Sequence, residues 1–114
     1  MAIELKFPRN GQYPEQMFSF VKDLVFLEQL KAAGFGQAAL VIFADDPLFY
    51  EGPTSGIYDY FRARKGTLVA EQKLCGQITK PTGSRDEELL LHGEYLVTWK
   101  PVRDKLRYAV IEVS

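Results

Sequence analysis

The chain has 114 residues, of which 46% are hydrophobic and 25% are charged, and its formal net charge at pH 7 is −1. This length and composition predict one folded domain over residues 1–114 and exclude a disordered chain. A single cysteine, Cys75, excludes an internal disulfide and is typical of a reducing compartment. The absence of a long apolar run and of a secretory signal predicts a cytoplasmic protein with no membrane partner.

The first expected element is a strand over residues 2–7, in which apolar and charged side chains alternate. Residues two apart on a strand point to the same face of the sheet. One face therefore carries a carboxylate beside an ammonium, and the opposite face is apolar and is expected to enter the core. The charged face holds Glu4 and Lys6, and the apolar face holds Ile3, Leu5 and Phe7.

A helix and a second strand are expected to follow. Residues 13–33 place apolar side chains at helical spacing, and Gly34 is well placed to end the helix. Residues 38–43 form an uninterrupted apolar run, which is typical of a strand buried on both faces. Strand, helix and buried strand predict a βαβ unit that occupies residues 1–46 of the domain.

The second half of the domain, residues 47–114, is expected to be mostly antiparallel β-structure, so the predicted fold class is α/β (α+β). A turn at residues 80–84 is flanked by short strands, which predicts a hairpin. The flanking strands cover residues 74–79 and 88–91, and two later strands, at 95–99 and 106–113, are joined by a polar turn at 101–105. Residues 57–62 fit either a short strand or a helical turn.

The pair Glu4 and Lys6 is the stretch in which local geometry favours chemistry. Hydrolysis of a phosphodiester needs a divalent cation held by carboxylate oxygens and a group that positions or activates the attacking water. A Glu-x-Lys triplet on one strand face supplies one metal ligand and one cationic group. The same triplet also occurs by chance in solvated edge strands, and that interpretation stays open.

The context of the triplet resembles the restriction-endonuclease-like, or PD-(D/E)xK, nuclease superfamily, and more narrowly a group of bacterial members. The resemblance is carried, in chain order, by Ile3-Glu4-Leu5-Lys6-Phe7, Phe18-Ser19-Phe20-Val21-Lys22-Asp23-Leu24, Phe43-Ala44-Asp45-Asp46-Pro47, Phe61-Arg62, Gly93-Glu94-Tyr95-Leu96-Val97-Thr98-Trp99 and Arg107-Tyr108-Ala109-Val110-Ile111-Glu112-Val113. It implies a magnesium-dependent endonuclease core that acts on DNA, in which Glu4 binds the metal and Lys6 serves the water.

One departure from the superfamily pattern matters. The superfamily places an aspartate on the strand before Glu-x-Lys and often an acidic residue on an earlier helix, whereas only residues 1–3 precede Glu4. One carboxylate makes a poor magnesium site. The expectation is a truncated core: a nuclease-like protein that binds or acts on DNA but is incomplete or inactive as this chain alone.

Three other charged residues, Asp45, Lys22 and Asp23, each have two interpretations. The carboxyl ends of neighbouring parallel strands converge, so Asp45 is a candidate metal ligand that would reach toward Glu4 and Lys6. The alternative is that Asp45 belongs to an ordinary turn before Pro47. Similarly, Lys22 and Asp23 either form the polar face of the helix or line the site.

A basic stretch offers a possible nucleic-acid contact, because between residues 62 and 80 only Glu71 is acidic. A solvated loop with scattered cations is the alternative. The candidates are Arg62, Arg64, Lys65, Lys73 and Lys80.

A different class of function also fits the chain. An apolar edge strand at residues 2–7 is a liability unless something covers it. The chain would then be a non-catalytic interaction module that pairs this strand with another subunit. A homodimer, or a partner that supplies the missing strands and aspartate, would satisfy the edge.

Overall fold

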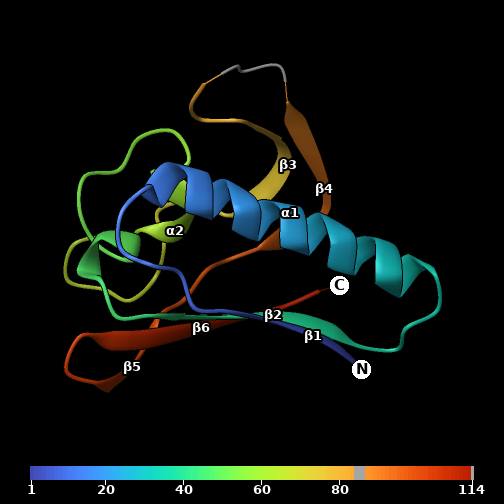
Figure 1. Ribbon diagram of the computed structural model, residues 1–114, viewed down its shortest axis with the longest axis horizontal. Coiled ribbons are helices and arrows are strands. Elements are labelled where there is room, and N and C mark those ends of the chain that lie inside the picture. Colours follow the sequence, from blue (N-terminus) through green and yellow to red (C-terminus); the bar gives the residue numbers. More distant parts are fainter. Residues whose placement is uncertain (84–86, 114) are drawn as a thin grey trace.

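The computed structural model describes residues 1–83 and 87–113 and has an α+β fold (Figure 1). In chain order the elements are β1 (Ala2–Lys6), α1 (Tyr13–Ala32), β2 (Ala38–Ala44), a 3₁₀ turn η1 (Pro47–Phe49), α2 (Tyr58–Phe61), β3 (Leu74–Thr79), β4 (Glu88–Tyr95), β5 (Lys100–Arg103) and β6 (Leu106–Glu112). The predicted strand–helix–strand start and the later antiparallel strands are confirmed.

The strands form a four-stranded mixed sheet and a separate hairpin. The order in the larger sheet is β1-β2-β6-β5, and β3 pairs with β4 in the hairpin. β1 and β2 are parallel, as a βαβ unit requires, and β6 lies antiparallel to β2. The two halves of the chain therefore share one sheet.

Helix α1 lies between the two sheets (Figure 1). It contacts β1 and β2 on one side and β4 on the other. Apolar residues at helical spacing fill both contacts, because burial of each side chain removes apolar surface from water. The fully or almost fully buried residues of α1 are Met17, Phe18, Phe20, Val21, Leu24 and Leu27. Gly34 follows the helix with φ +116°, which agrees with the expected helix end.

A carboxylate fastens the hairpin to α1. Glu28 accepts hydrogen bonds from the backbone N–H of His92 at 3.0 Å and of Gly93 at 2.8 Å, and from the Tyr95 hydroxyl at 2.5 Å. Burial would raise the pKa of Glu28, but these hydrogen bonds to the charged form outweigh it and leave the pKa below its usual value.

Replacement of Glu28 by glutamine should therefore remove a pH-dependent part of the stability. The folded state holds the carboxylate charged at a lower pH than the unfolded state does, so stability from Glu28 is present above a pH of about 4.5 and is lost as the pH falls through the folded-state pKa. We expect Glu28→Gln to cost about 2 kcal/mol at pH 7. Urea unfolding at pH 7 and at pH 3 measures it, and an equal cost at both pH values would contradict the assignment.

The orientation of β1 contradicts the sequence-based expectation. The apolar side chains Ile3, Leu5 and Phe7 do not enter the core but remain 54%, 55% and 69% exposed. The alternate residues Glu4 and Lys6 are half-buried on the side of α1, where Lys6 forms an ion pair with the helix. The helix therefore covers the charged face of β1.

The expectation that the second strand is buried on both faces is also only half correct. Leu40 and Ile42 are fully buried under α1, whereas Val41 and Phe43 on the other face are half-buried. In Figure 1, α1 and the β3–β4 hairpin both lie on the opposite side of the sheet from this face.

Two local expectations in the second half were wrong and one ambiguity is resolved. Residues 101–103 belong to strand β5 rather than to a turn; proline is tolerated there because β5 is an edge strand. Residues 96–99 are not a regular strand, although Thr98 makes an isolated bridge to Val69. Residues 58–61 form the helical turn α2. The β3–β4 hairpin forms as predicted, but β4 runs on to Tyr95 rather than ending at Leu91, and Ser84 of the expected turn lies outside the described residues.

In the described part of the chain, no helix is both long enough and apolar enough to cross a membrane.

Candidate functional site

The cluster of charges on the inner face of β1 contains both residues of the Glu-x-Lys triplet. Glu4 and Lys6 point toward α1 because β1 presents alternate residues to the helix. The Lys6 Nζ lies 3.1 Å from Oδ2 of Asp23, in the third turn of α1. The site therefore consists of two carboxylates and one ammonium at the edge of the sheet.

Asp23 is the electrostatically perturbed member of this cluster. Burial raises the pKa of Asp23, the ammonium of Lys6 opposes that rise, and the nearby carboxylate of Glu4 adds to it. Its Oδ2 is buried and, among the described residues, makes no hydrogen bond of good geometry, although Lys6 neutralises it at ion-pair distance. A buried oxygen with unused bonding capacity is the feature that a cation or a water would satisfy.

Asp23 joins the site, whereas the sequence left it as either a helix face or a site residue. Its neighbour Lys22 points elsewhere and pairs with Glu87 at 3.1 Å beside the hairpin. The sequence feature that indicates a special role for Asp23 is its position among apolar residues of α1. This feature alone does not indicate which strand residue faces Asp23.

Asp45 does not join this cluster. It is exposed and lines a cavity with Phe7 and Phe43, whose side chains lie on the outer face of the sheet, opposite to Glu4 and Lys6. Its neighbour Asp46 accepts a hydrogen bond from the backbone N–H of Leu48 and another from the hydroxyl of Tyr13. The Asp-Asp-Pro segment thus has the turn role that was its alternative interpretation.

Arg62, a candidate nucleic-acid contact, is buried instead. It is 6% exposed, and its guanidinium donates to the backbone carbonyls of Leu48 at 2.9 Å and Pro53 at 2.8 Å. The same group lies 3.8 Å from the ring centroid of Tyr58. Arg62 therefore holds the loop at residues 48–53 onto α2 and is not available to a phosphate.

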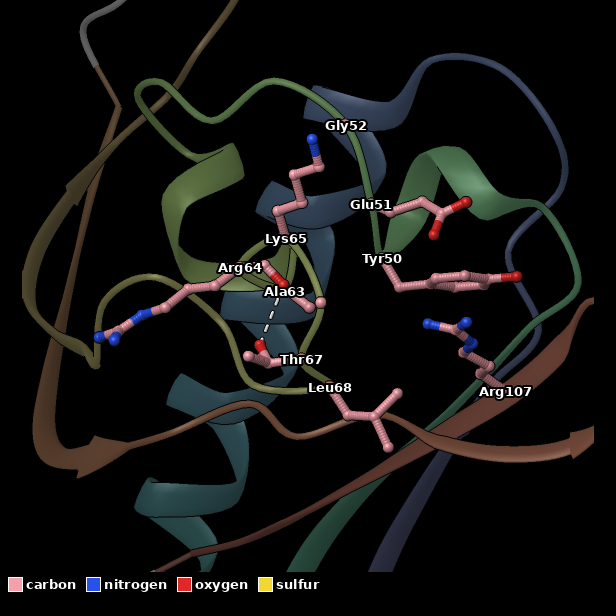
Figure 2. Close-up of a pocket in the computed structure, with 10 residues that line it drawn as sticks. Tyr50, Glu51, Gly52, Ala63, Arg64, Lys65, Thr67, Leu68 and Arg107 are labelled. Atoms are coloured by element: carbon pink, nitrogen blue, oxygen red, sulfur yellow. Dashed lines mark hydrogen bonds between the residues drawn. The ribbon is translucent and has the colours of Figure 1, made fainter.

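Two other basic candidates border a cavity with a volume of about 560 Å³ (Figure 2). Arg64 and Lys65 lie on one side of it, and Arg107 lies on the other, 4.1 Å from the ring centroid of Tyr50. Figure 2 shows Arg64 pointing away from Tyr50 and Arg107, and its guanidinium pairs with Glu71 at 3.1 Å. This cavity contains none of the Glu4 cluster.

The remaining basic candidates lie apart from that cavity. Lys80 is half-buried and lines a cavity beside the first turns of α1, at the end of β3. Lys73 is exposed in the segment before β3. The five basic residues therefore do not form one continuous surface, because the chain turns between them.

The arrangement on β1 has a limited metal-binding capacity. Within residues 1–83 and 87–113, no group of three or more histidine, cysteine, aspartate or glutamate side chains is placed to hold a metal ion. Glu4 and Asp23 offer two carboxylates, and Lys6 offers a cation beside them.

Comparisons of the chain with protein-family models, with curated proteins and with solved structures found no match.

Proposed function

We propose that this chain is a nuclease-like protein, related to metal-dependent phosphodiester hydrolases of the PD-(D/E)xK type, that binds or acts on DNA. The observation that supports it is the gathering of Glu4, Lys6 and Asp23 on one side of a parallel βαβ unit, with 3.1 Å between Lys6 Nζ and Asp23 Oδ2. The order of the sequence motifs and the geometry of the charged cluster both favour β1 as the strand that carries the site.

The residues present fit a magnesium ion at a minimal level. Magnesium in phosphoryl-transfer sites is commonly bound by one or two carboxylates together with waters and substrate phosphate oxygens. Glu4 and Asp23 would be those carboxylates. The buried Oδ2 of Asp23 supports that assignment, because among the described residues it has Lys6 as an ion-pair partner but no hydrogen bond of good geometry. A bound magnesium ion supplies charge neutralisation at the phosphate and a more acidic water.

Lys6 has a separate role in this proposal. Its ammonium neutralises Asp23 in the structure, and it stands on the same face as Glu4. Beside a substrate phosphate, it would orient the attacking water and stabilise negative charge that develops in the transition state. A site with only these three groups binds metal weakly, so catalysis is proposed to need further acidic residues from a partner.

The test measures metal binding before activity. Manganese added to the full chain should broaden the NMR signals of β1 and of α1 around Asp23, with a dissociation constant on the order of 1 mM. Glu4→Gln and Asp23→Asn should each weaken binding at least about tenfold, because each removes a charged ligand. Glu94→Gln, at an exposed position of β4, is the matched control and should leave binding unchanged.

Cleavage of plasmid DNA in magnesium or manganese is the second measurement. We expect no robust cutting by the chain alone, and salt-dependent retention on DNA. Robust cutting that is lost in Glu4→Ala would show that the chain is catalytically complete. Absence of both metal binding and DNA retention at low salt would overturn the nuclease proposal.

A second function, a protein-interaction module, is favoured by the edge position of β1. Within the described residues β1 pairs with β2 alone, so the backbone N–H and C=O groups on its other side are open. Such an edge pairs readily with a strand of another chain. Hydrogen exchange tests this: outward-facing amides of Ile3 and Leu5 that exchange slowly only when a partner is present would support it, and fast exchange throughout would exclude it.

A further inference from the structure

The outer face of the four-stranded sheet is mostly apolar, with one charged residue at each end. We define the outer face as the side turned away from α1, and its side chains stand in three ranks across the strands. The ranks are Ile3, Ala39 and Glu112; Leu5, Val41 and Val110; and Phe7, Phe43, Tyr108 and Lys100. Large hydrophobic residues are normally buried, so a face of this kind marks a surface that another molecule covers.

The aromatic rank is already ordered. The rings of Phe7 and Phe43 stack with centroids 5.1 Å apart and planes 7° apart, and Phe43 lies 5.9 Å from Tyr108. Phe7 nevertheless remains 69% exposed, which is more than either Leu5 or Val110. Because these rings already pack against one another, a molecule that covers them would cause little further loss of side-chain conformational entropy.

We propose that the outer face binds the outer face of a second copy of this chain, through a two-fold axis that runs along the middle rank. This proposal does not rest on the nuclease proposal, because Glu4 and Lys6 point to the opposite side of the sheet. In the dimer each strand lies over its own copy and runs in the opposite direction, so that the two sheets pack face to face.

The self-complementarity of the three ranks supports this axis. The two-fold axis places the aromatic rank of one copy over the rank that contains Ala39 in the other. Phe43 would then fill the space above the small side chain of Ala39, and the middle rank would pack on itself. Large side chains over small ones allow the two faces to interdigitate at the density of a protein core.

Charge complementarity supports the same axis. Glu112 lies at one end of the outer face and Lys100 at the other, and both are exposed. Reversal of strand direction brings Lys100 of one copy near Glu112 of the other. An axis parallel to the strands, between β2 and β6, would instead place Lys100 against Phe7 and Glu112 against Ala39, leaving both charges covered without a partner.

The available area is sufficient for a dimer of moderate affinity. Seven apolar or aromatic side chains of the three ranks, each partly exposed, would lose about 600 Å² per copy, or about 1,200 Å² in total, given about 150–250 Å² for a whole large side chain. This lies at the lower end of stable, specific interfaces. We therefore expect a dissociation constant in the micromolar range, on the order of 10 μM.

Sedimentation velocity of the full chain from about 1 to 200 μM tests the dimer. We expect the mass to rise from one copy to two across this range. Leu5→Glu should raise the dissociation constant at least about 50-fold, because the axis sets the two new carboxylates near each other in an apolar interface. Phe26→Glu is the matched control, since Phe26 is 53% exposed, against 55% for Leu5, and lies on α1; it should leave the dimer intact.

A charge exchange tests the direction of stacking. Glu112→Lys and Lys100→Glu should each weaken the dimer about three- to tenfold, and the double variant should restore the original affinity. Circular dichroism confirms that each variant is folded. A chain that stays monomeric at 200 μM, or a dimer insensitive to Leu5→Glu, would overturn the proposal; a double variant no stronger than the single ones would overturn the proposed axis. Pairing through the edge of β1 would leave Lys100 and Glu112 without effect.

Discussion

Replacement of Arg62 by alanine is expected to lower the free energy of unfolding by about 3 kcal/mol. The substitution removes the charged donor from the carbonyls of Leu48 and Pro53, and a hydrogen bond to a charged group contributes about 1.5–3 kcal/mol. The contact with the ring of Tyr58 is lost as well. Burial lowers the pKa of the Arg62 guanidinium, yet the group stays charged at neutral pH, so the effect should be nearly constant between pH 6 and 8.

Urea unfolding measures this effect, and two controls define its origin. Arg62→Lys keeps the charge but lacks the planar fork that reaches two carbonyls, so it should still cost about 2 kcal/mol. Arg64→Ala, at an exposed position, should change stability by no more than about 0.5 kcal/mol. If Arg62→Lys weakened DNA retention but left stability intact, Arg62 would be a nucleic-acid contact. The assignment of Arg62 as the residue that holds the loop at residues 48–53 onto α2 would then be wrong.

The close approach of Arg62 also explains a glycine. Gly52 has φ +132°, and a Cβ built there would lie 3.1 Å from a guanidinium nitrogen of Arg62. Both the backbone conformation and the space therefore favour glycine at this position. The loop at residues 48–53 packs around the guanidinium of Arg62. Arg62 is therefore buried, although it belongs to a basic stretch of the sequence.

Replacement of Trp99 by alanine is expected to cost about 4 kcal/mol. The indole is fully buried, its N–H donates to the carbonyl of Phe61 at 2.6 Å, and its ring lies 5.9 Å from that of Tyr50. Truncation of a buried aromatic leaves a cavity that the surroundings fill only in part. The midpoint of thermal unfolding should fall by about 15–30 °C, at about 4–8 °C per kcal/mol.

Differential scanning calorimetry checks this expectation against two further variants. Trp99→Phe keeps much of the volume but leaves the Phe61 carbonyl unpaired, and it should cost about 2 kcal/mol. Leu96→Ala, three residues away and 48% exposed, should change stability by less than about 0.5 kcal/mol. A Trp99→Ala protein that unfolds within a few degrees of the original would mean that Trp99 does not join the segments around Phe61 and Tyr50.

Arg62 and Trp99 hold together segments within the second half of the chain. Trp99 and Arg62 donate to backbone carbonyls in the loop at residues 48–53 and at the end of α2. These side-chain hydrogen bonds satisfy backbone carbonyls that lie outside the strands and so have no partner in a strand ladder. The second half of the chain is therefore organised in part by two buried side chains.

The candidate site was predictable in part. The sequence alone placed Glu4 and Lys6 on one strand face, since alternation along a strand depends only on local geometry. It could not place Asp23 beside them or separate Asp45 from them, because both relations depend on the position of α1 relative to the sheet. It could not predict that Arg62 is buried, because a buried arginine and an exposed one have the same sequence pattern when the acceptors are backbone carbonyls.

The fold shows the same division. Apolar residues at helical spacing predicted α1, an uninterrupted apolar run predicted β2, and turn residues predicted the β3–β4 hairpin, because these signals are local. β5 escaped prediction because it is a short edge strand that contains a proline, and such a strand exists only through its pairing with β6.

The first strand shows most clearly what each level decides. The sequence by itself determined that Ile3, Leu5 and Phe7 share one face and that Glu4 and Lys6 share the other. Only the tertiary structure decided which face meets the helix, since a strand with two distinct faces fits a sheet in either orientation. Asp23 of α1 pairs with Lys6, so the charged face is turned toward the helix and the apolar face is turned away from it.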